Sequence, residues 1–239
     1  MAGPQSNTPG GEWTRLNNTR SGFITRCESY ASYTLPRLCT PQGFNAMTDD
    51  LSHDWQSIGA QAVNHVVNKL VLALFAPSRP FFRLEVDAAW KAAAVGSGIP
   101  EAQIDEALAR AEQEAVKELD RRGTIRPKLY QALSNLVVLG NALVYLPEKK
   151  GEDMRVFGIK NFIVRRTGAG KVKTILIREP LMFDELEPDV QQYCMSKGAR
   201  HTATTPVEFF RWVQRESDGT YSLSQWVDAY RLPRAYDGK

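Results

Sequence analysis

A run of basic side chains is the feature of this sequence that most directly suggests chemistry. Between Met154 and Arg178 there is no Asp or Glu, but there are seven basic residues: Arg155, Lys160, Arg165, Arg166, Lys171, Lys173 and Arg178. Predicted strands joined by a turn at Thr167–Gly170 would carry them and present a basic face to a polyanion. The candidate DNA or polyanion contacts are the residues flanking the turn: Arg165, Arg166, Lys171 and Lys173.

Two other interpretations remain open for this basic segment. The charges could lie on a solvated sheet face, or they could pair with the seven acidic residues of a predicted helix between Glu101 and Asp120. The segment has no RNA-binding signature with stacking aromatic residues. Reversing the charge of Lys171 and Lys173 would separate DNA contact from these alternatives.

No catalytic motif is complete in the chain. The segment from Gly168 to Lys171 lacks both the earlier glycine of a phosphate-binding loop and the Ser or Thr after its lysine, because Arg165 and Val172 stand there. The glycines beside Ser97 are adjacent to it, whereas a nucleophile elbow places them two residues away. The sequence therefore predicts a hairpin turn at Gly168 and no enzyme.

Metal ligands are sparse and badly spaced. The Cys and His residues form no short-range pair, and zinc needs three or four ligands at a workable spacing: Cys27, Cys39, Cys194, His53, His65 and His201. Asp49, Asp50 and Asp54 could hold a divalent cation before a predicted helix, although capping of that helix explains them as well. A metal-dependent hydrolase using these three is the weakest hypothesis. We expect no metal and no cofactor.

The composition is that of a folded chain. Of 239 residues, 43% are apolar and 24% charged, and the formal net charge is +3. This charge excludes a strongly basic nucleic-acid coat, but not a local basic face. The longest apolar run, Leu70–Ala76, is far shorter than the roughly 20 residues of a membrane span. Three cysteines without a secretory signal favour reduced thiols and assembly in the cytosol.

The first half of the chain has helical spacing. Apolar residues three or four apart predict helices over Gly11–Thr34 and Ser52–Phe75, and the second of these has the wide apolar face of a core helix. Two further helices are predicted, from Pro100 to Arg122 and from Pro127 to Leu139.

Strand patterns dominate the second half. The predicted strands are Phe82–Val86, Ala142–Leu146, Arg155–Ile159, Phe162–Arg166, Lys171–Arg178, Val207–Arg215 and Tyr221–Tyr230, with one short helix at Pro188–Lys197. Helices first and strands second predict an α+β fold with antiparallel strands and hairpins in the C-terminal half.

Several blocks of sequence resemble a known family. The blocks are Tyr33 to Pro36, Gly59 to Asn64, Lys69 to Pro77, Arg79 to Leu84 and Leu136 to Glu148. In this order and spacing they closely resemble the portal (head-tail connector) proteins of short-tailed podoviruses of the autographivirus group. The similarity is dense from Arg26 to Glu148 and thins from Arg155 to Tyr230.

The resemblance implies a structural subunit of a phage portal ring, typically of twelve copies, at one capsid vertex of the virion. Double-stranded DNA would be packaged and ejected through its channel, and the ring would join head to tail. The partners would be further copies of the chain, capsid and scaffolding protein, and terminase and tail adaptor proteins, with no membrane. Assembly would take place in the host bacterial cytoplasm, and the packaging ATPase would belong to the terminase.

Portals of this family are considerably longer than this chain. We therefore expect a portal wing-like domain over residues 12–239, helical over 12–140 and mainly strand over 141–239. The stem, clip and crown would lie beyond Lys239. Residues 1–11, rich in Gly and Pro, are predicted to be a disordered N-terminal tip.

A ring subunit must bury two different side faces. The stripe of the first predicted helix is a candidate subunit interface, because aromatic residues and Arg are favoured in interface cores: Trp13, Arg20, Phe23 and Tyr30. Packing of this helix on the Ser52–Phe75 helix is the equal alternative. The alternative function is a monomeric nucleic-acid-binding or adaptor module that acts through the basic 154–178 strands.

Overall fold

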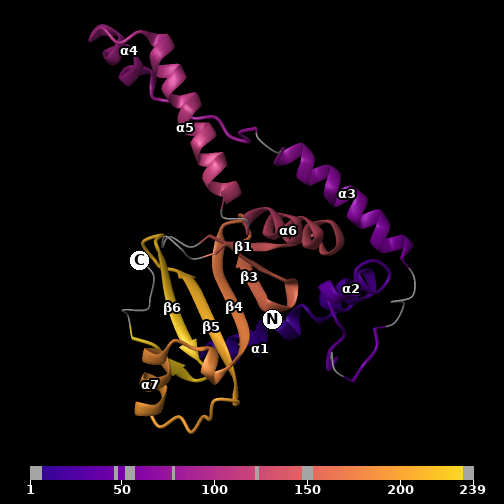
Figure 1. The fold of residues 1–239 in the computed structure, drawn as a ribbon. Helices are drawn as coiled ribbons and strands as arrows, with labels where there is room; N and C mark the ends of the chain where they lie inside the picture. The colour runs from indigo at the N-terminus through magenta and orange to yellow at the C-terminus, as the bar shows by residue number, and fades with distance from the viewer. Residues whose placement is uncertain are drawn as a thin grey trace. The chain divides into compact units, whose positions relative to one another are not determined.

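The computed structural model describes residues 7–45, 48–51, 57–76, 79–121, 124–146 and 153–233. By its contacts the chain divides into two compact units, and the wing-like domain over residues 12–239 stays a prediction. Unit 1 comprises Met1–Ser29 and Phe157–Lys239, and unit 2 comprises Tyr30–Val156. The α+β prediction is confirmed, with helices concentrated in the N-terminal half and antiparallel strands in the C-terminal half (Figure 1).

The elements follow in chain order. The α-helices are α1 Pro9–Thr19, α2 Ser21–Ser32, α3 Ile58–Leu74, α4 Ala88–Gly96, α5 Glu101–Arg121, α6 Ile125–Leu139 and α7 Pro188–Ser196. The strands are β1 Leu143–Tyr145, β2 Arg155–Phe157, β3 Phe162–Arg166, β4 Val172–Met182, β5 Pro206–Arg215, β6 Tyr221–Val227 and β7 Tyr230–Arg231. Short 3-10 turns lie at Pro36–Leu38, Ile159–Asn161 and Phe183–Glu185.

Unit 1 is built on a five-stranded antiparallel sheet of order β3-β4-β5-β6-β7. The predicted hairpin turn between β3 and β4 is confirmed: the Thr167 N–H donates to the Lys171 carbonyl at 2.8 Å, and Gly170 has a φ of 80°. The second predicted hairpin turn, between β5 and β6, is also present, with the Glu216 N–H bound to the Thr220 carbonyl at 2.9 Å.

Both faces of this sheet are covered. Successive side chains of a strand point to opposite faces, so Phe210 and Trp212 share one face while Val207 and Phe209 share the other. The first pair packs with Trp13 and with other residues of α1 and the sheet, as α1 crosses the strands. The second pair packs with Phe183, with α7 and with the β6 and β7 region. Unit 1 is therefore a closed helix–sheet–helix sandwich.

The single helix predicted over Gly11–Thr34 is wrong, because the helix breaks at Arg20. Arg20 has φ −108° and ψ 11°, which ends α1, and α2 starts one residue later. Thr8 caps α1 by accepting the Gly11 N–H at 3.4 Å, and Pro9 takes the first helical position, where its missing N–H costs nothing. Helix α1 thus begins within the stretch expected to be a disordered tip.

Unit 2 is a set of helices joined by polar contacts. Helix α3 packs against α6, where Tyr130 donates its hydroxyl to Asn64 Oδ1 at 2.8 Å. Arg126 of α6 donates to the Phe75 carbonyl at 2.6 Å and to Asp120 at 2.7 Å. Lys91 joins α4 to α5 through ion pairs with two acidic residues of α5.

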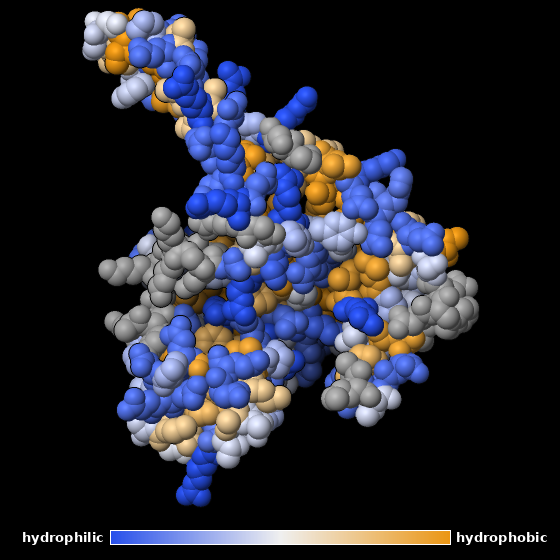
Figure 2. Space-filling model, viewed as in Figure 1, coloured by the Kyte–Doolittle hydropathy of each residue, from blue (hydrophilic) through white to orange (hydrophobic). Residues whose placement is uncertain are grey.

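The prediction that Ser52–Phe75 is a core helix is wrong for the described residues. Only Val63 and Val67 of α3 are buried, whereas Ile58 is 76% and Leu72 60% exposed. Figure 2 shows hydrophobic surface at both ends of α3. Residues 52–56, which include the predicted cap Ser52, lie outside the described residues.

In unit 2 one predicted strand is wrong and one helix was missed. The segment Phe82–Val86 forms no strand; instead the Leu84 N–H is bound by the Glu112 carboxylate at 2.6 Å. Helix α4 was not predicted, although Asp87 caps it by accepting the Ala89 N–H at 2.8 Å. Asp before an alanine-rich run is a helix-start signal, and the alternation that precedes it hid this signal.

Candidate nucleic-acid interface

The turns at 167–170 and 217–220 lie at the same end of the unit 1 sheet. Tyr221 at the start of β6 donates its hydroxyl to the Val172 carbonyl of β4 at 3.0 Å, across β5. Arg215 is opposite Tyr221, and Thr174 is opposite Gln214. One residue further along that register, Lys173 lies beside Arg215. Lys173, Arg215 and Tyr221 therefore form one row across three strands.

All four predicted polyanion contacts lie at this end, which we call the basic sheet end. Arg166, Lys171 and Lys173 are exposed, and Arg165 is half-buried. Arg215, which the sequence analysis did not include, is exposed in the same place. In the described part of the chain, no carboxylate lies within ion-pair distance of any of these five side chains. Arg166 makes one local contact, to the Gly170 carbonyl at 3.1 Å.

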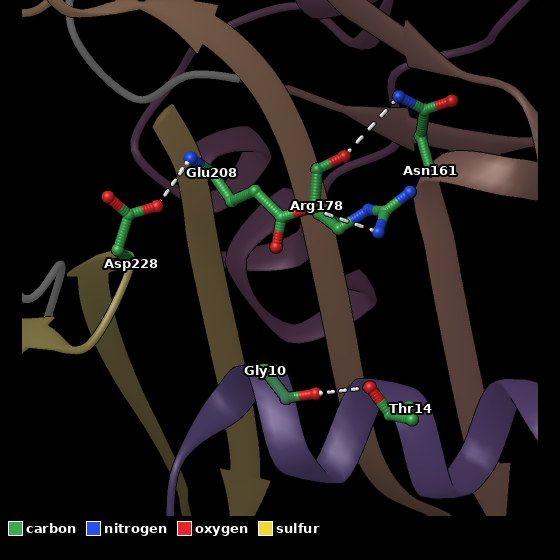
Figure 3. Close-up of polar contacts among 6 residues, drawn as sticks. All are labelled: Gly10, Thr14, Asn161, Arg178, Glu208 and Asp228. Atoms are coloured by element: carbon green, nitrogen blue, oxygen red, sulfur yellow. Dashed lines mark hydrogen bonds and ion pairs between the residues drawn. The ribbon is translucent and has the colours of Figure 1, made fainter. Parts of the chain in front are cut away.

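The remaining basic residues of the segment lie elsewhere. Arg178 pairs with Glu208 at 3.1 Å and its guanidinium lies 4.9 Å from the Trp13 ring centre. In Figure 3, Glu208 also donates its N–H to Asp228, and Asn161 donates to the Arg178 carbonyl. Lys160 pairs with Glu28, and Arg155 belongs to β2. The predicted basic segment thus separates into an internally paired part and the basic sheet end.

Two acidic residues lie at the same end and are both engaged. Asp218 accepts the Thr220 hydroxyl at 2.6 Å and the Thr220 N–H at 2.9 Å. These two hydrogen bonds lower the pKa of the Asp218 carboxyl, the hydroxyl contributing most. Glu216 accepts the Ser222 hydroxyl. With five cations and two anions, the basic sheet end keeps an excess of positive charge.

The acidic residues of α5, which were considered as partners for the basic segment, are occupied within unit 2. Six of them bind basic side chains and one binds a backbone N–H: Glu101 and Asp105 with Lys91, Glu106 with Arg110, Glu114 with Lys117, Glu118 with Arg121, Asp120 with Arg126, and Glu112 with the Leu84 N–H. This weakens the interpretation that these acids neutralise the basic segment within the chain.

Two aromatic side chains of β5 are placed for packing, whereas Tyr221 of β6 is 52% exposed. Phe210 and Trp212 are 1% and 5% exposed and belong to the core under α1. Single-stranded nucleic acids are usually held by stacking of bases on exposed aromatic rings. Neither ring is available for such stacking, because α1 covers that face of the sheet.

The four residues of the predicted subunit interface have different environments. Trp13 is buried in the sheet core, so it packs on the sheet rather than on α3. Arg20 donates to the Phe162 carbonyl at 2.7 Å and lies over the Trp13 ring. Phe23 is half-buried and Tyr30 is 57% exposed. Tyr30 is the most accessible of the four, and its contact with a neighbouring copy stays a prediction.

The candidate metal residues are not assembled in the described part of the chain. No group of three or more His, Cys, Asp or Glu side chains there is placed to hold a metal ion. Asp49 instead accepts the Asn45 N–H at 2.8 Å, and Asp54 lies outside the described residues. All three cysteines are buried thiols, and burial raises the pKa of Cys27 and Cys194. No helix among the described residues is long and apolar enough to cross a membrane.

Comparison with known proteins identifies the class. The family model described as "Bacteriophage head to tail connecting protein" matches residues 8–232. This span begins at the cap of α1 and ends just after β7, so it includes both units. The chain belongs to this family of phage head-tail connectors.

The individual relatives are all called portal proteins. The chain is 29% identical over 224 residues to the portal protein of Escherichia phage T7, covering 92% of this chain and 41% of that protein. It is 31% identical over 219 residues to that of Enterobacteria phage T3, covering 90% and 40%. For Pseudomonas phage phiKMV the identity is 28% over 205 residues, covering 85% and 39%. The chain thus spans about two fifths of the length of these relatives.

Proposed function

We propose that the chain is part of a structural subunit of a phage portal, in which copies of the subunit form a ring at one vertex of the capsid. The observation that carries the proposal is the family match over residues 8–232. The proposed ring would have twelve members and would give double-stranded DNA a passage into and out of the head. The chain would act as a wing-like part of that subunit.

The distribution of hydrophobic surface supports assembly through unit 2. All but three of the exposed large hydrophobic side chains among the described residues belong to unit 2; the exceptions are Met182, Met195 and Tyr221. Extended apolar surface on a soluble protein usually marks an interaction site. A closed ring needs two different faces on each subunit, which meet head to tail. Helix α3, with Ile58 and Leu72 exposed, is a candidate for one of them.

The partners and location follow from the same proposal. The ring would join capsid to tail in the virion and would be assembled in the host cytoplasm with scaffolding protein. Terminase and tail adaptor proteins would bind mainly through regions that correspond to the part of the relatives not matched by this chain. We propose no enzymatic activity for the chain, because none of the catalytic motifs considered is complete.

The first test measures the mass of the purified chain by light scattering on a sizing column, with negative-stain images of the leading peak. Rings with a central hole are the expected result and would place an assembly surface within these residues. A particle of 26.8 kDa at every concentration would contradict the presence of a sufficient assembly surface here. A monomer that binds DNA would instead favour the monomeric binding-module alternative.

A matched pair of variants tests the role of α3. I58E/L72E places two charges on the exposed apolar side of α3. The dissociation constant of the oligomer should rise tenfold or more, because burying the two charges in an interface costs about 2–3 kcal/mol when both sites are partly buried. M182E/M195E adds the same charge to exposed residues of unit 1 and should leave assembly unchanged. Equal effects of both pairs would show that net charge, rather than the α3 surface, is responsible.

A further inference from the structure

We propose that the basic sheet end binds the phosphates of double-stranded DNA, and that Arg215 belongs to this site together with Arg165, Arg166, Lys171 and Lys173. The inference concerns a surface of one copy of the chain, so it does not depend on ring assembly. It also differs from passage of DNA through a channel, which concerns the assembled ring.

The distribution of paired and unpaired basic side chains in unit 1 supports the proposal. Several basic side chains elsewhere in unit 1 pair with carboxylates: Lys160 with Glu28, Arg178 with Glu208 and Arg211 with Glu179. At the basic sheet end, five cations in the described structure have no carboxylate in ion-pair distance. Cations without a carboxylate partner that gather at one end of a sheet attract a polyanion, and the release of its counterions drives binding.

The backbone of the sheet holds these basic residues in fixed positions. Lys173 and Arg215 lie on β4 and β5, the longest strand pair of the sheet, and adjacent strands are about 4.8 Å apart. The hydrogen bonds of Tyr221 to Val172 and of Arg166 to Gly170 tie the neighbouring elements together. A charged surface that is ordered before binding loses less conformational entropy on contact with its ligand.

Duplex DNA fits this surface better than a single strand or an acidic protein surface does. Phe210 and Trp212 are buried under α1, and Tyr221, which is 52% exposed at the site, has its hydroxyl bound to the Val172 carbonyl. Of these three rings only one is open to a base, whereas proteins that hold a single strand stack successive bases on several rings. The most acidic helix of the chain, α5, has its carboxylates engaged within unit 2, so a second copy offers few free anions there. Backbone phosphates need neither stacking nor a free carboxylate partner.

The test measures binding of the full 239-residue chain to a fluorescein-labelled random 20-bp duplex by fluorescence anisotropy over a range of NaCl concentrations. Five phosphate contacts give a slope of log K against log salt of about −4.5. The double variant K173Q/R215Q should weaken binding by about tenfold or more at low salt and reduce the slope by about 1.8. Two unrelated duplex sequences should bind within about threefold of each other, since phosphates carry no sequence information.

A matched control separates this site from net charge. K197Q/R200Q removes the same charge from exposed residues at the opposite end of the sheet, beside α7, and should leave binding within about twofold. Thermal unfolding of both variants checks that the fold is kept. Unchanged binding of K173Q/R215Q, or an equal loss in K197Q/R200Q, would overturn the proposal.

Two competitors test the choice of ligand. A single strand of the same length should bind more weakly than the duplex, and tighter binding of that strand would overturn the duplex assignment. Polyglutamate should compete poorly at equal charge concentration, and equal competition would assign the surface to an acidic protein instead. Light scattering in the same buffer reports assembly separately, so loss of DNA binding and loss of oligomer are distinguishable.

Discussion

The two units of this chain bury their hydrophobic side chains to very different extents. In unit 1 large core residues, such as Phe210, Phe183 and Leu176, are at most 1% exposed. In unit 2 residues of equal size, such as Trp90 and Leu72, are more than half exposed. The smallest residues, Ala and Val, make up most of what unit 2 does bury.

The difference in burial suggests different roles for the two units of this connector chain. The sheet of unit 1 has a hydrophobic core on each face and leaves few large apolar side chains exposed. Helices that pack in pairs bury only a stripe each, so unit 2 keeps apolar surface that a neighbouring protein could cover. From this comparison we propose that unit 1 supplies most of the folding stability and that the assembly surface lies in unit 2.

The largest expected effect is a loss of stability in unit 1. Phe210→Ala removes a ring that is 1% exposed from the core under α1 and should lower the free energy of unfolding by about 3–5 kcal/mol. Trp90→Ala removes a larger ring from unit 2 and should change it by less than about 1 kcal/mol, because Trp90 is 56% exposed. Urea denaturation of both variants measures the two values. Similar losses would contradict the division between the units.

The second prediction tests how closely α3 packs against the rest of unit 2. A Cβ on Gly59 of α3 would lie 1.9 Å from the Tyr33 carbonyl oxygen, so Gly59→Ala should destabilise the chain by about 1–3 kcal/mol. Gly96, at the end of α4, has nothing within 4 Å of such a Cβ. Gly96→Ala should be neutral or stabilise by up to about 1 kcal/mol, since alanine favours helix. Thermal unfolding compares them, and equal results would mean that α3 does not pack on Tyr33.

The third prediction compares arginines of the two units. Arg178 pairs with Glu208 and also lies over the buried Trp13 ring, so Arg178→Ala should cost about 1–2 kcal/mol. Arg110 of α5 pairs with Glu106 on an exposed helix surface, where such a pair contributes about 0.3–0.5 kcal/mol. Chemical denaturation of Arg178→Ala and Arg110→Ala measures both. A loss for Glu208→Gln as large as that for Arg178→Ala would assign the effect to the ion pair instead of the ring.

Much of the fold could be predicted from local patterns. The strand alternation and the Gly-containing turns gave β3 to β6 and both hairpins, because period and turn chemistry are local properties. The extent of burial on α3 could not be predicted, since an apolar stripe looks the same whether it meets its own chain or another protein. The break between α1 and α2 at Arg20 was missed because the apolar residues on either side of it keep a helical spacing.

The candidate site was predictable in part for a similar reason. The four basic residues beside the Thr167–Gly170 turn are adjacent in the sequence, so their charge is visible there. Arg215 comes from another hairpin, and only the register of β4 with β5 brings it to Lys173. Pairing of Lys160 and Arg178 with carboxylates was equally invisible, because Glu28 and Glu208 are distant in sequence.

The smallest expected effect concerns Asp218, at the basic sheet end of unit 1. Hydrogen bonds from Thr220 hold the pKa of this carboxyl below its ordinary value of 3.8. The stability that the ionised group contributes is therefore present above that value and is lost as the pH falls through the lower pKa of the folded state. Asp218→Asn should be less stable than the parent chain at pH 7, and the difference should shrink toward pH 2. A difference independent of pH, measured by denaturation at both values, would contradict this cause. Because the same change removes a negative charge beside Arg215, it should also tighten binding of duplex DNA slightly at pH 7, which would connect the turn directly to the proposed phosphate site.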